Sequence, residues 1–237
     1  MELIREHWTQ KDYNDFMEYL KSLADEKYKK FTDSLVPGTN FSLGIRVPIL
    51  RTTAKQISKG NYEEFLKCEK GVYREEIMLE GFVMSLIKCD YQQMLTYIKE
   101  YADKITCWET CDVCSFKGLK KHLEEFFRDI EYFIYHTNPW VVRFGFGCLL
   151  EFYLTDEYIN SVLKYVDSID SDFYYVQMMQ GWLIATAAAK CRDKTMAYLA
   201  DNHLNPTTQN MAVRKIRESN RISKEDKEFV KQFKKQS

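Results

Sequence analysis

The sequence predicts an all-α chain of helical hairpins stacked on one another. Nine glycines and four prolines in 237 residues leave little turn chemistry for an all-β fold. Signals for helix starts and helix ends recur along the chain, and no stretch predicts a strand of more than a few residues. Aromatic-rich helices are expected to begin near residues 74, 108, 140 and 172, a spacing close to that of a two-helix repeat. We therefore expect a curved solenoid that forms one domain over residues 1–237.

The predicted helices are bounded by recognisable start and stop signals. Thr9 followed by Asp12 is an N-cap with an acidic residue three positions later, which predicts a helix beginning at residue 10. The dipeptide Pro37-Gly38 is expected to end the second helix, and Pro48 suits the first turn of the third. Gly60 is expected to close that third helix as a C-terminal cap. The helices are predicted over residues 10–25, 27–36, 49–59, 62–68, 74–88, 91–104, 108–128, 131–136, 140–154, 155–169, 172–191, 194–202, 207–221 and 225–235.

The composition is that of a globular chain whose charge is unevenly distributed. Hydrophobic residues make up 45% and charged residues 29%, which excludes the disordered class. The net charge is −1, yet residues 203–237 carry nine Lys or Arg and four Asp or Glu. This basic end either meets a polyanion or is a solvated helix face. No apolar run approaches the roughly 18 residues of a membrane span, and the seven cysteines are expected to be reduced thiols in a cytoplasmic protein.

Two pairs of aromatic and charged residues share predicted helix faces. Trp108 and Asp112 are four positions apart, and Trp140 and Arg143 are three apart, so each pair lies on one side of its helix. Taken alone, each tryptophan is more often a core residue, and Arg143 could simply pair with Asp112. The functional interpretation depends on these pairs recurring in consecutive hairpins.

A third helix face carries Tyr175, Met178 and Trp182 at spacings of three and four residues. If the three helices lie side by side, they bring two indoles, a carboxylate, a guanidinium and a phenol to one surface.

Four segments of the chain, taken together, resemble a known family. They are Gly44-Ile45-Arg46-Val47-Pro48-Ile49-Leu50-Arg51, Trp108-x-x-x-Asp112, Asn138-Pro139-Trp140-x-x-Arg143 and Gln177-x-x-Gln180-Gly181-Trp182. In this order they resemble the HEAT-like repeat DNA glycosylases, the AlkD-like DNA alkylation repair family. The resemblance spans roughly residues 25–220. It implies HEAT-like helical hairpins curved around a DNA duplex, with a basic or aromatic concave face.

The resemblance also implies an activity and a setting. Members of this family excise cationic N3- or N7-alkylated purines from double-stranded DNA without flipping the base into a pocket, unlike most base-modifying enzymes. We therefore expect a hydrolytic glycosylase that needs no metal and no organic cofactor. The expected partner is duplex DNA with alkylated purines, and no membrane. We expect a monomer in the bacterial cytoplasm that associates with the nucleoid when it is bound to DNA.

The roles implied by the resemblance suit the chemistry of the residues. An alkylated purine leaves as a neutral base, so positive charge moves onto the deoxyribose, where an ionised carboxylate stabilises it and orients water. Asp112 is expected in this role, and Trp108 and Trp182 are expected to contact the cationic nucleotide through their ring faces. The residues expected to bind DNA are Arg143 as a phosphate ligand, Tyr175, Tyr28 and Trp140.

The sequence departs from the family's pattern after Trp182, and two alternative functions stay open. Active members of the family often carry an Arg one turn after the last tryptophan, whereas Leu183, Ile184, Ala185 and Thr186 follow Trp182 here. A non-catalytic paralogue that binds DNA structure is therefore the main alternative. The second alternative is a HEAT-like scaffold that binds proteins.

Three further signals carry less weight. Cys107-x-x-x-Cys111-x-x-Cys114 has the spacing of an iron–sulfur motif but lies in a predicted helix, so we interpret these cysteines as small buried residues. The four histidines are scattered and have no metal-ligand spacing. Two basic clusters either touch phosphate or are solvated: Lys117, Lys120 and Lys121, and Arg214, Lys215, Arg217 and Arg221.

Overall fold

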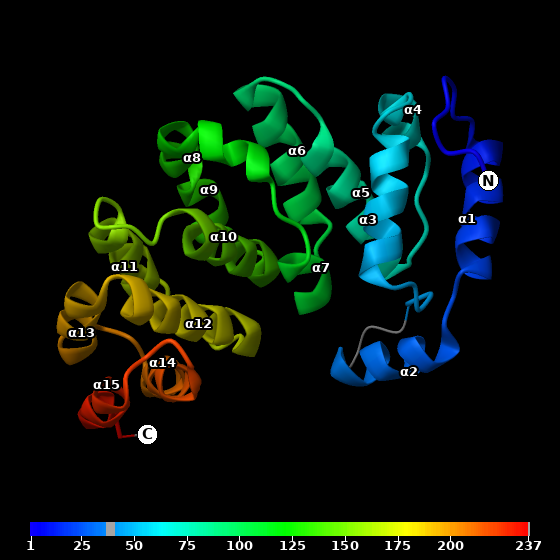
Figure 1. Ribbon diagram of the computed structural model, residues 1–237. Helices are drawn as coiled ribbons and strands as arrows, with labels where there is room; N and C mark the ends of the chain where they lie inside the picture. The colour runs from blue at the N-terminus through cyan, green and yellow to red at the C-terminus, as the bar shows by residue number, and fades with distance from the viewer. Residues whose placement is uncertain (37–40, 237) are drawn as a thin grey trace. The chain divides into compact units, whose positions relative to one another are not determined.

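The computed structural model describes residues 1–36 and 41–236, which are helical and contain no β-strand (Figure 1). The first helices are α1 (Gln10–Ser22), α2 (Glu26–Leu35), α3 (Val47–Ile57), α4 (Tyr62–Lys67), α5 (Arg74–Leu86), α6 (Tyr91–Asp103), α7 (Trp108–Asp112) and the 3-10 helix η1 (Lys117–Lys121). They are followed by α8 (Leu123–Asp129), α9 (Glu131–Ile134), α10 (Pro139–Phe152), α11 (Ile159–Ser168), α12 (Tyr174–Lys190), α13 (Arg192–Ala200), α14 (Pro206–Glu218), α15 (Lys224–Phe229) and η2 (Val230–Phe233). The predicted all-α class is confirmed.

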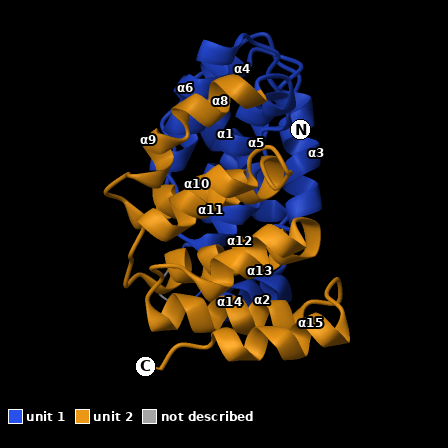
Figure 2. Cartoon of the chain, turned by 90° about the vertical axis from the view of Figure 1, so that its left-hand side faces the viewer, with its two compact units in different colours: residues 1–122 blue, residues 123–237 orange. Residues whose placement is uncertain are grey.

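The chain divides into two compact units, Met1–His122 and Leu123–Ser237, which Figure 2 shows in separate colours. Each unit has its own buried core. In the first, Trp8 and Phe16 pack edge-on against Phe65. In the second, Phe126 packs against Phe133 in a fully buried cluster. The single domain expected over residues 1–237 stays a prediction, and the units are described one at a time.

The second unit is a series of helical hairpins. Helix α12 packs against α10 on one side and α14 on the other, and α11 packs against α13 in a second layer (Figure 1). Because α12 has neighbours on two sides, apolar residues occupy most of its circumference, including the buried Leu183 and Ile184. This stacking of hairpins confirms the predicted repeat architecture.

The first unit is built around α5, which packs against α3, α6 and α7. Gly81 in α5 lies against the ring of Tyr101 from α6, so closely that a Cβ at this position would be 2.3 Å from the ring. The close approach lets the buried Tyr101 hydroxyl donate a hydrogen bond to the carbonyl of Thr110 in α7. A glycine in α5 therefore determines where α7 lies.

Most predicted helix starts agree with the structure. The Thr9 side chain accepts a hydrogen bond from the backbone N–H of Asp12, and the Asp12 carboxylate accepts one from the backbone N–H of Thr9, at 3.2 and 2.9 Å. Pro48 lies in the first turn of α3, as expected. Asn138 caps α10 by accepting from the backbone N–H of Trp140 at 3.0 Å. The predicted stop at Pro37-Gly38 lies outside the described residues.

The predicted helix over residues 108–128 is wrong. The structure has α7, η1 and α8 in its place, because hydrogen bonds from distant side chains satisfy the carbonyls at which the helix would continue. The Tyr101 hydroxyl donates to the Thr110 carbonyl, and Nη2 of Arg51 donates to the Val113 carbonyl at 2.7 Å. Carbonyls at a helix end that accept hydrogen bonds from distant side chains do not need a capping residue next to them in the sequence.

Gly60 has a different role from the one predicted. Its N–H donates to the Ile57 carbonyl at 3.0 Å, but among the described glycines only Gly44 has a positive φ, so Gly60 is not a left-handed cap. A Cβ at Gly60 would be 2.4 Å from the carbonyl oxygen of Arg5. Gly60 is therefore needed so that the N-terminal segment can pass close to this loop.

Candidate functional site

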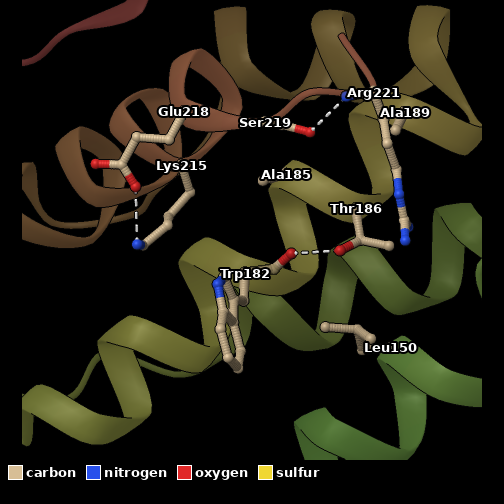
Figure 3. Close-up of a pocket in the computed structure, with 9 residues that line it drawn as sticks. All are labelled: Leu150, Trp182, Ala185, Thr186, Ala189, Lys215, Glu218, Ser219 and Arg221. Atoms are coloured by element: carbon tan, nitrogen blue, oxygen red, sulfur yellow. Dashed lines mark hydrogen bonds and ion pairs between the residues drawn. The ribbon is translucent and has the colours of Figure 1, made fainter.

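Trp182 stands at an open cleft in the second unit, between α12 and α14 (Figure 3). Its side chain is 45% exposed, because its neighbours Leu183 and Ile184 take the buried face of α12. The cleft has a volume of about 360 Å³. Its other lining residues are Leu150, Ala185, Thr186, Ala189, Lys215, Glu218, Ser219 and Arg221. The predicted face of Tyr175, Met178 and Trp182 is thus confirmed as the partly exposed face of α12.

The cleft has two cationic side chains and one carboxylate. Nζ of Lys215 is 2.9 Å from the Glu218 carboxylate, and Nε of Arg214 is 3.7 Å from it. The hydrogen bond from Lys215 lowers the pKa of Glu218 below its ordinary value. The Arg221 guanidinium has no ion-pair partner among the described residues. The cleft is therefore positive overall, and Arg221 contributes its uncompensated charge.

Arg143 and Trp140, from α10, meet at Tyr175 in the first turn of α12. Arg143 is only 2% exposed, and its Nη1 donates to the Tyr175 carbonyl at 2.6 Å. The Trp140 ring lies 4.9 Å from the Tyr175 ring and packs edge-on against Phe173 at 5.1 Å. These contacts fix the start of α12 on α10. The expected contact of Arg143 with phosphate stays a prediction, because the guanidinium is buried and already donates to a carbonyl.

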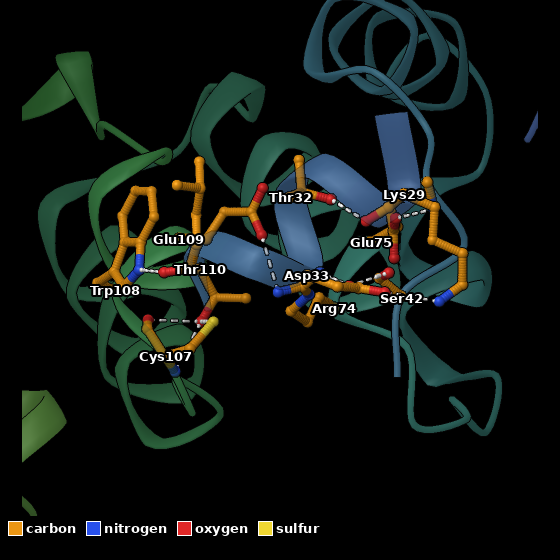
Figure 4. Close-up of polar contacts among 12 residues, drawn as sticks. Lys29, Thr32, Asp33, Ser42, Arg74, Glu75, Cys107, Trp108, Glu109 and Thr110 are labelled. Carbon is orange, nitrogen blue, oxygen red and sulfur yellow. Dashed lines mark hydrogen bonds and ion pairs between the residues drawn. The ribbon is translucent and has the colours of Figure 1, made fainter. Parts of the chain in front are cut away.

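In the first unit, Trp108 begins α7 and is held in place by α2 (Figure 4). Its indole N–H donates to the carbonyl of Leu35, the last residue of α2, at 3.1 Å. Tyr28, on the same helix, is half-buried under the Arg46 guanidinium, which lies 4.7 Å from the ring centre. The structure thus brings the predicted residues Trp108 and Tyr28 to the same part of the fold.

A buried arginine links α2 to α7 beside Trp108 (Figure 4). Arg74, 4% exposed at its side chain, places Nη2 2.6 Å from Asp33 and Nη1 3.3 Å from Glu109. Burial raises the pKa of Glu109 above its ordinary value, although Arg74 opposes this shift. Sequence reasoning missed this network. The available signal was that Glu109 lies next to Trp108, but nothing in the sequence paired it with Arg74.

Asp112 is the last residue of α7 and is exposed. The hydrogen bonds that Tyr101 and Arg51 donate to the Thr110 and Val113 carbonyls hold the backbone on either side of it. An exposed carboxylate on a backbone fixed in this way suits an electrostatic role toward a ligand. Of the predicted site residues, Trp108, Asp112 and Tyr28 lie in the first unit. Trp140, Arg143, Tyr175 and Trp182 belong to the second.

No three His, Cys, Asp or Glu side chains in residues 1–36 and 41–236 are grouped so that they could hold a metal ion. Cys107, Cys111 and Cys114 are buried, which agrees with their interpretation as small core residues. None of the helices described is long and apolar enough to cross a membrane.

Comparison with known families matches this chain to one family model. The model is described as DNA alkylation repair enzyme and covers residues 16–216, which include every residue discussed above from Tyr28 to Trp182. A search of curated proteins finds no match.

Proposed function

The chain belongs to the DNA alkylation repair enzyme family, and we propose that it is a DNA glycosylase for cationic N3- and N7-alkylated purines in duplex DNA. The observation that carries this proposal is the exposed carboxylate of Asp112 one turn from Trp108, on a helix whose start is held by the Trp108 indole and whose end is held by Arg51. Such a carboxylate does not need to move to meet positive charge, which is the condition for electrostatic catalysis.

In the proposed reaction the bond between C1′ of deoxyribose and the purine nitrogen breaks, and the electron pair leaves with the base. The alkylated purine departs as a neutral molecule, so no general acid is needed. The deoxyribose acquires oxocarbenium character, which the Asp112 carboxylate stabilises. Asp112 also orients a water whose oxygen bonds to C1′, and the proton lost from that water passes to the carboxylate and then to solvent. The products are the free base and an abasic site.

The aromatic side chains and Arg143 are proposed to hold the nucleotide. Trp108 and Trp182 contact the cationic nucleotide, which an electron-rich indole face attracts by roughly 0.5–2 kcal/mol. Tyr28 in the first unit, and Tyr175 and Trp140 in the second, are proposed as further contacts to DNA. Arg143 exchanges the Tyr175 carbonyl for a backbone phosphate when DNA binds. The enzyme acts without a metal or organic cofactor, as a monomer, and the base is not flipped into a pocket.

The test is the release of free base from duplex DNA that contains N7-methylguanine. The wild-type chain is expected to release N7-methylguanine, and Asp112→Asn to lose that release by roughly 10²-fold while it binds the same duplex with unchanged affinity. Asp103→Asn, at the exposed end of α6, is the matched control and should behave as wild type. A wild-type chain that binds the duplex and releases no base would contradict the enzyme proposal.

The second candidate function is a non-catalytic protein that binds DNA structure. The observation that favours it is that α12 has only Ala185 and Thr186 one turn after Trp182, so this helix offers no cation there. This candidate predicts binding that falls steeply with salt, since phosphate contacts release counterions, but no base release by wild type or variant.

A further inference from the structure

The cleft beside Trp182 receives a guanidinium from outside α12. Arg221 lies after the end of α14, and in Figure 3 its side chain extends into the cleft toward Thr186. The segment that carries it is fixed on both sides. The Arg221 N–H donates to Oγ of Ser219 at 3.2 Å, and Ile222 is buried. Arg221 is thus presented by an ordered backbone.

The part of α12 that follows Trp182 leaves room for the Arg221 side chain. Ala185, Thr186 and Ala189 follow Trp182 on the cleft side of the helix, and all three are small. A long side chain at any of these positions would fill the space that the guanidinium occupies. The small residues on α12 and the arginine after α14 are therefore complementary.

The charge of the cleft distinguishes Arg221 from its basic neighbours. Lys215 and Arg214 both approach the Glu218 carboxylate, so their charges are partly compensated within the chain. Arg221 has no such partner among the described residues. Its planar guanidinium offers two parallel N–H groups, which fit the oxygens of a phosphodiester better than a lysine does.

We propose that Arg221 binds a backbone phosphate of the DNA strand whose nucleotide contacts Trp182. The cation thus comes from the segment after α14 and not from α12 itself. This inference rests on the proposed function, in that it takes Trp182 as a nucleotide contact. Lys215 contributes less, because binding a phosphate requires it to give up part of its pairing with Glu218.

The test is a titration of an unmodified DNA duplex at several salt concentrations. Arg221→Ala is expected to weaken binding about tenfold, since a charge-assisted hydrogen bond to phosphate is lost. It should also reduce the slope of the logarithm of affinity against the logarithm of salt by about 0.9. Arg217→Ala is the control, because it removes the same charge from an exposed position on α14 that lies outside the cleft. Equal effects of the two substitutions would overturn the proposal.

A relocated arginine adds a second readout. Thr186→Arg places a guanidinium on the cleft face of α12, so combining it with Arg221→Ala is expected to restore most of the lost affinity. No recovery in a folded double variant would contradict the assignment.

Base release from N7-methylguanine duplex separates this proposal from the glycosylase proposal. If wild type releases the base, and Arg221→Ala and Arg217→Ala bind the duplex with the same affinity, only the role of Arg221 is overturned. Absence of release, with Arg221→Ala weakening binding selectively, overturns the glycosylase and supports the phosphate contact. A wild-type chain without salt-dependent DNA binding overturns both.

Discussion

Trp108 and Trp182 occupy contrasting surroundings in the two units. The Trp108 indole donates to a carbonyl at the end of α2, and a buried guanidinium joins the flanking Glu109 to the same helix. Trp182 is exposed over a cleft with a floor of small side chains, and no described residue accepts from its indole N–H. The Trp108 indole is therefore held by a polar contact, whereas Trp182 is positioned by the packing of α12 between α10 and α14.

The difference indicates a division of work. A group that stabilises charge as it develops must be fixed before the reaction, because reorganisation costs free energy. Polar contacts that hold α7 provide that fixed position for Trp108 and Asp112. A surface that receives DNA must stay open, which the cleft at Trp182 does. Substitutions in the two regions are therefore expected to differ in their effects on stability.

Arg74→Met should destabilise the chain by roughly 3–5 kcal/mol, because it leaves the Asp33 and Glu109 carboxylates without their buried partner. Lys215→Met is the counterpart in the second unit, where the pair with Glu218 is more exposed, and should cost at most about 1 kcal/mol. Urea unfolding followed by circular dichroism measures both. Losses of similar size would show that the two regions are held alike.

Gly81→Ala should destabilise the chain by roughly 1–3 kcal/mol, because the new Cβ overlaps the buried Tyr101 ring at 2.3 Å. Gly147→Ala in α10 should instead stabilise it by roughly 0.5–1 kcal/mol. Its Cβ would meet only Met179, at 3.7 Å, and alanine favours a helix more than glycine does. The free energies of unfolding from urea titrations should therefore move in opposite directions. A harmless Gly81→Ala would contradict the tight packing behind α7.

Glu109→Gln and Glu218→Gln should alter the pH dependence of stability with opposite signs. Burial raises the pKa of Glu109, so the folded chain binds this proton more tightly than the unfolded chain does. Stability therefore decreases as the pH rises above the ordinary carboxyl pKa. Lys215 lowers the pKa of Glu218, so the stability that this group contributes is present above the ordinary carboxyl pKa. That contribution is lost as the pH falls through the lowered pKa.

Both pH effects should be the smallest of the series, since water screens both carboxylates in part. Urea midpoints measured on either side of about pH 4.3 provide the comparison. Glu109→Gln is expected to remove a decrease in stability with rising pH, and Glu218→Gln to remove an increase. Shifts of the same sign would contradict the contrast between the two sites.

Local signals in the sequence were sufficient where a helix is ended by its own residues. The Thr9 and Asp12 capping box, Pro48 and Asn138 lie where the sequence predicts them. The break after Asp112 could not be predicted, because the carbonyls there are satisfied by Tyr101 and Arg51 from other helices. Only the folded chain brings those donors to α7.

For the candidate site, spacing predicted which face of α12 is exposed but not how buried each charged residue is. Arg143 shares the spacing of a surface residue, yet it is buried because α10 presents it to the carbonyl of Tyr175. Arg221 is remote in sequence from Trp182, and stacking of α14 on α12 brings it into the same cleft. Such contacts between repeats depend on three-dimensional packing and leave no periodic signal in one sequence.

The most direct test of the account is the single-turnover rate of N7-methylguanine release at a protein concentration that saturates a duplex carrying one lesion. Saturation removes any difference in affinity, so the rate reports the step in which the bond to the base breaks. We expect measurable release by wild type and a rate roughly 10²-fold lower for Asp112→Asn, with equal occupancy of the duplex. Equal rates for the two proteins, or no release by wild type on occupied DNA, would contradict this expectation.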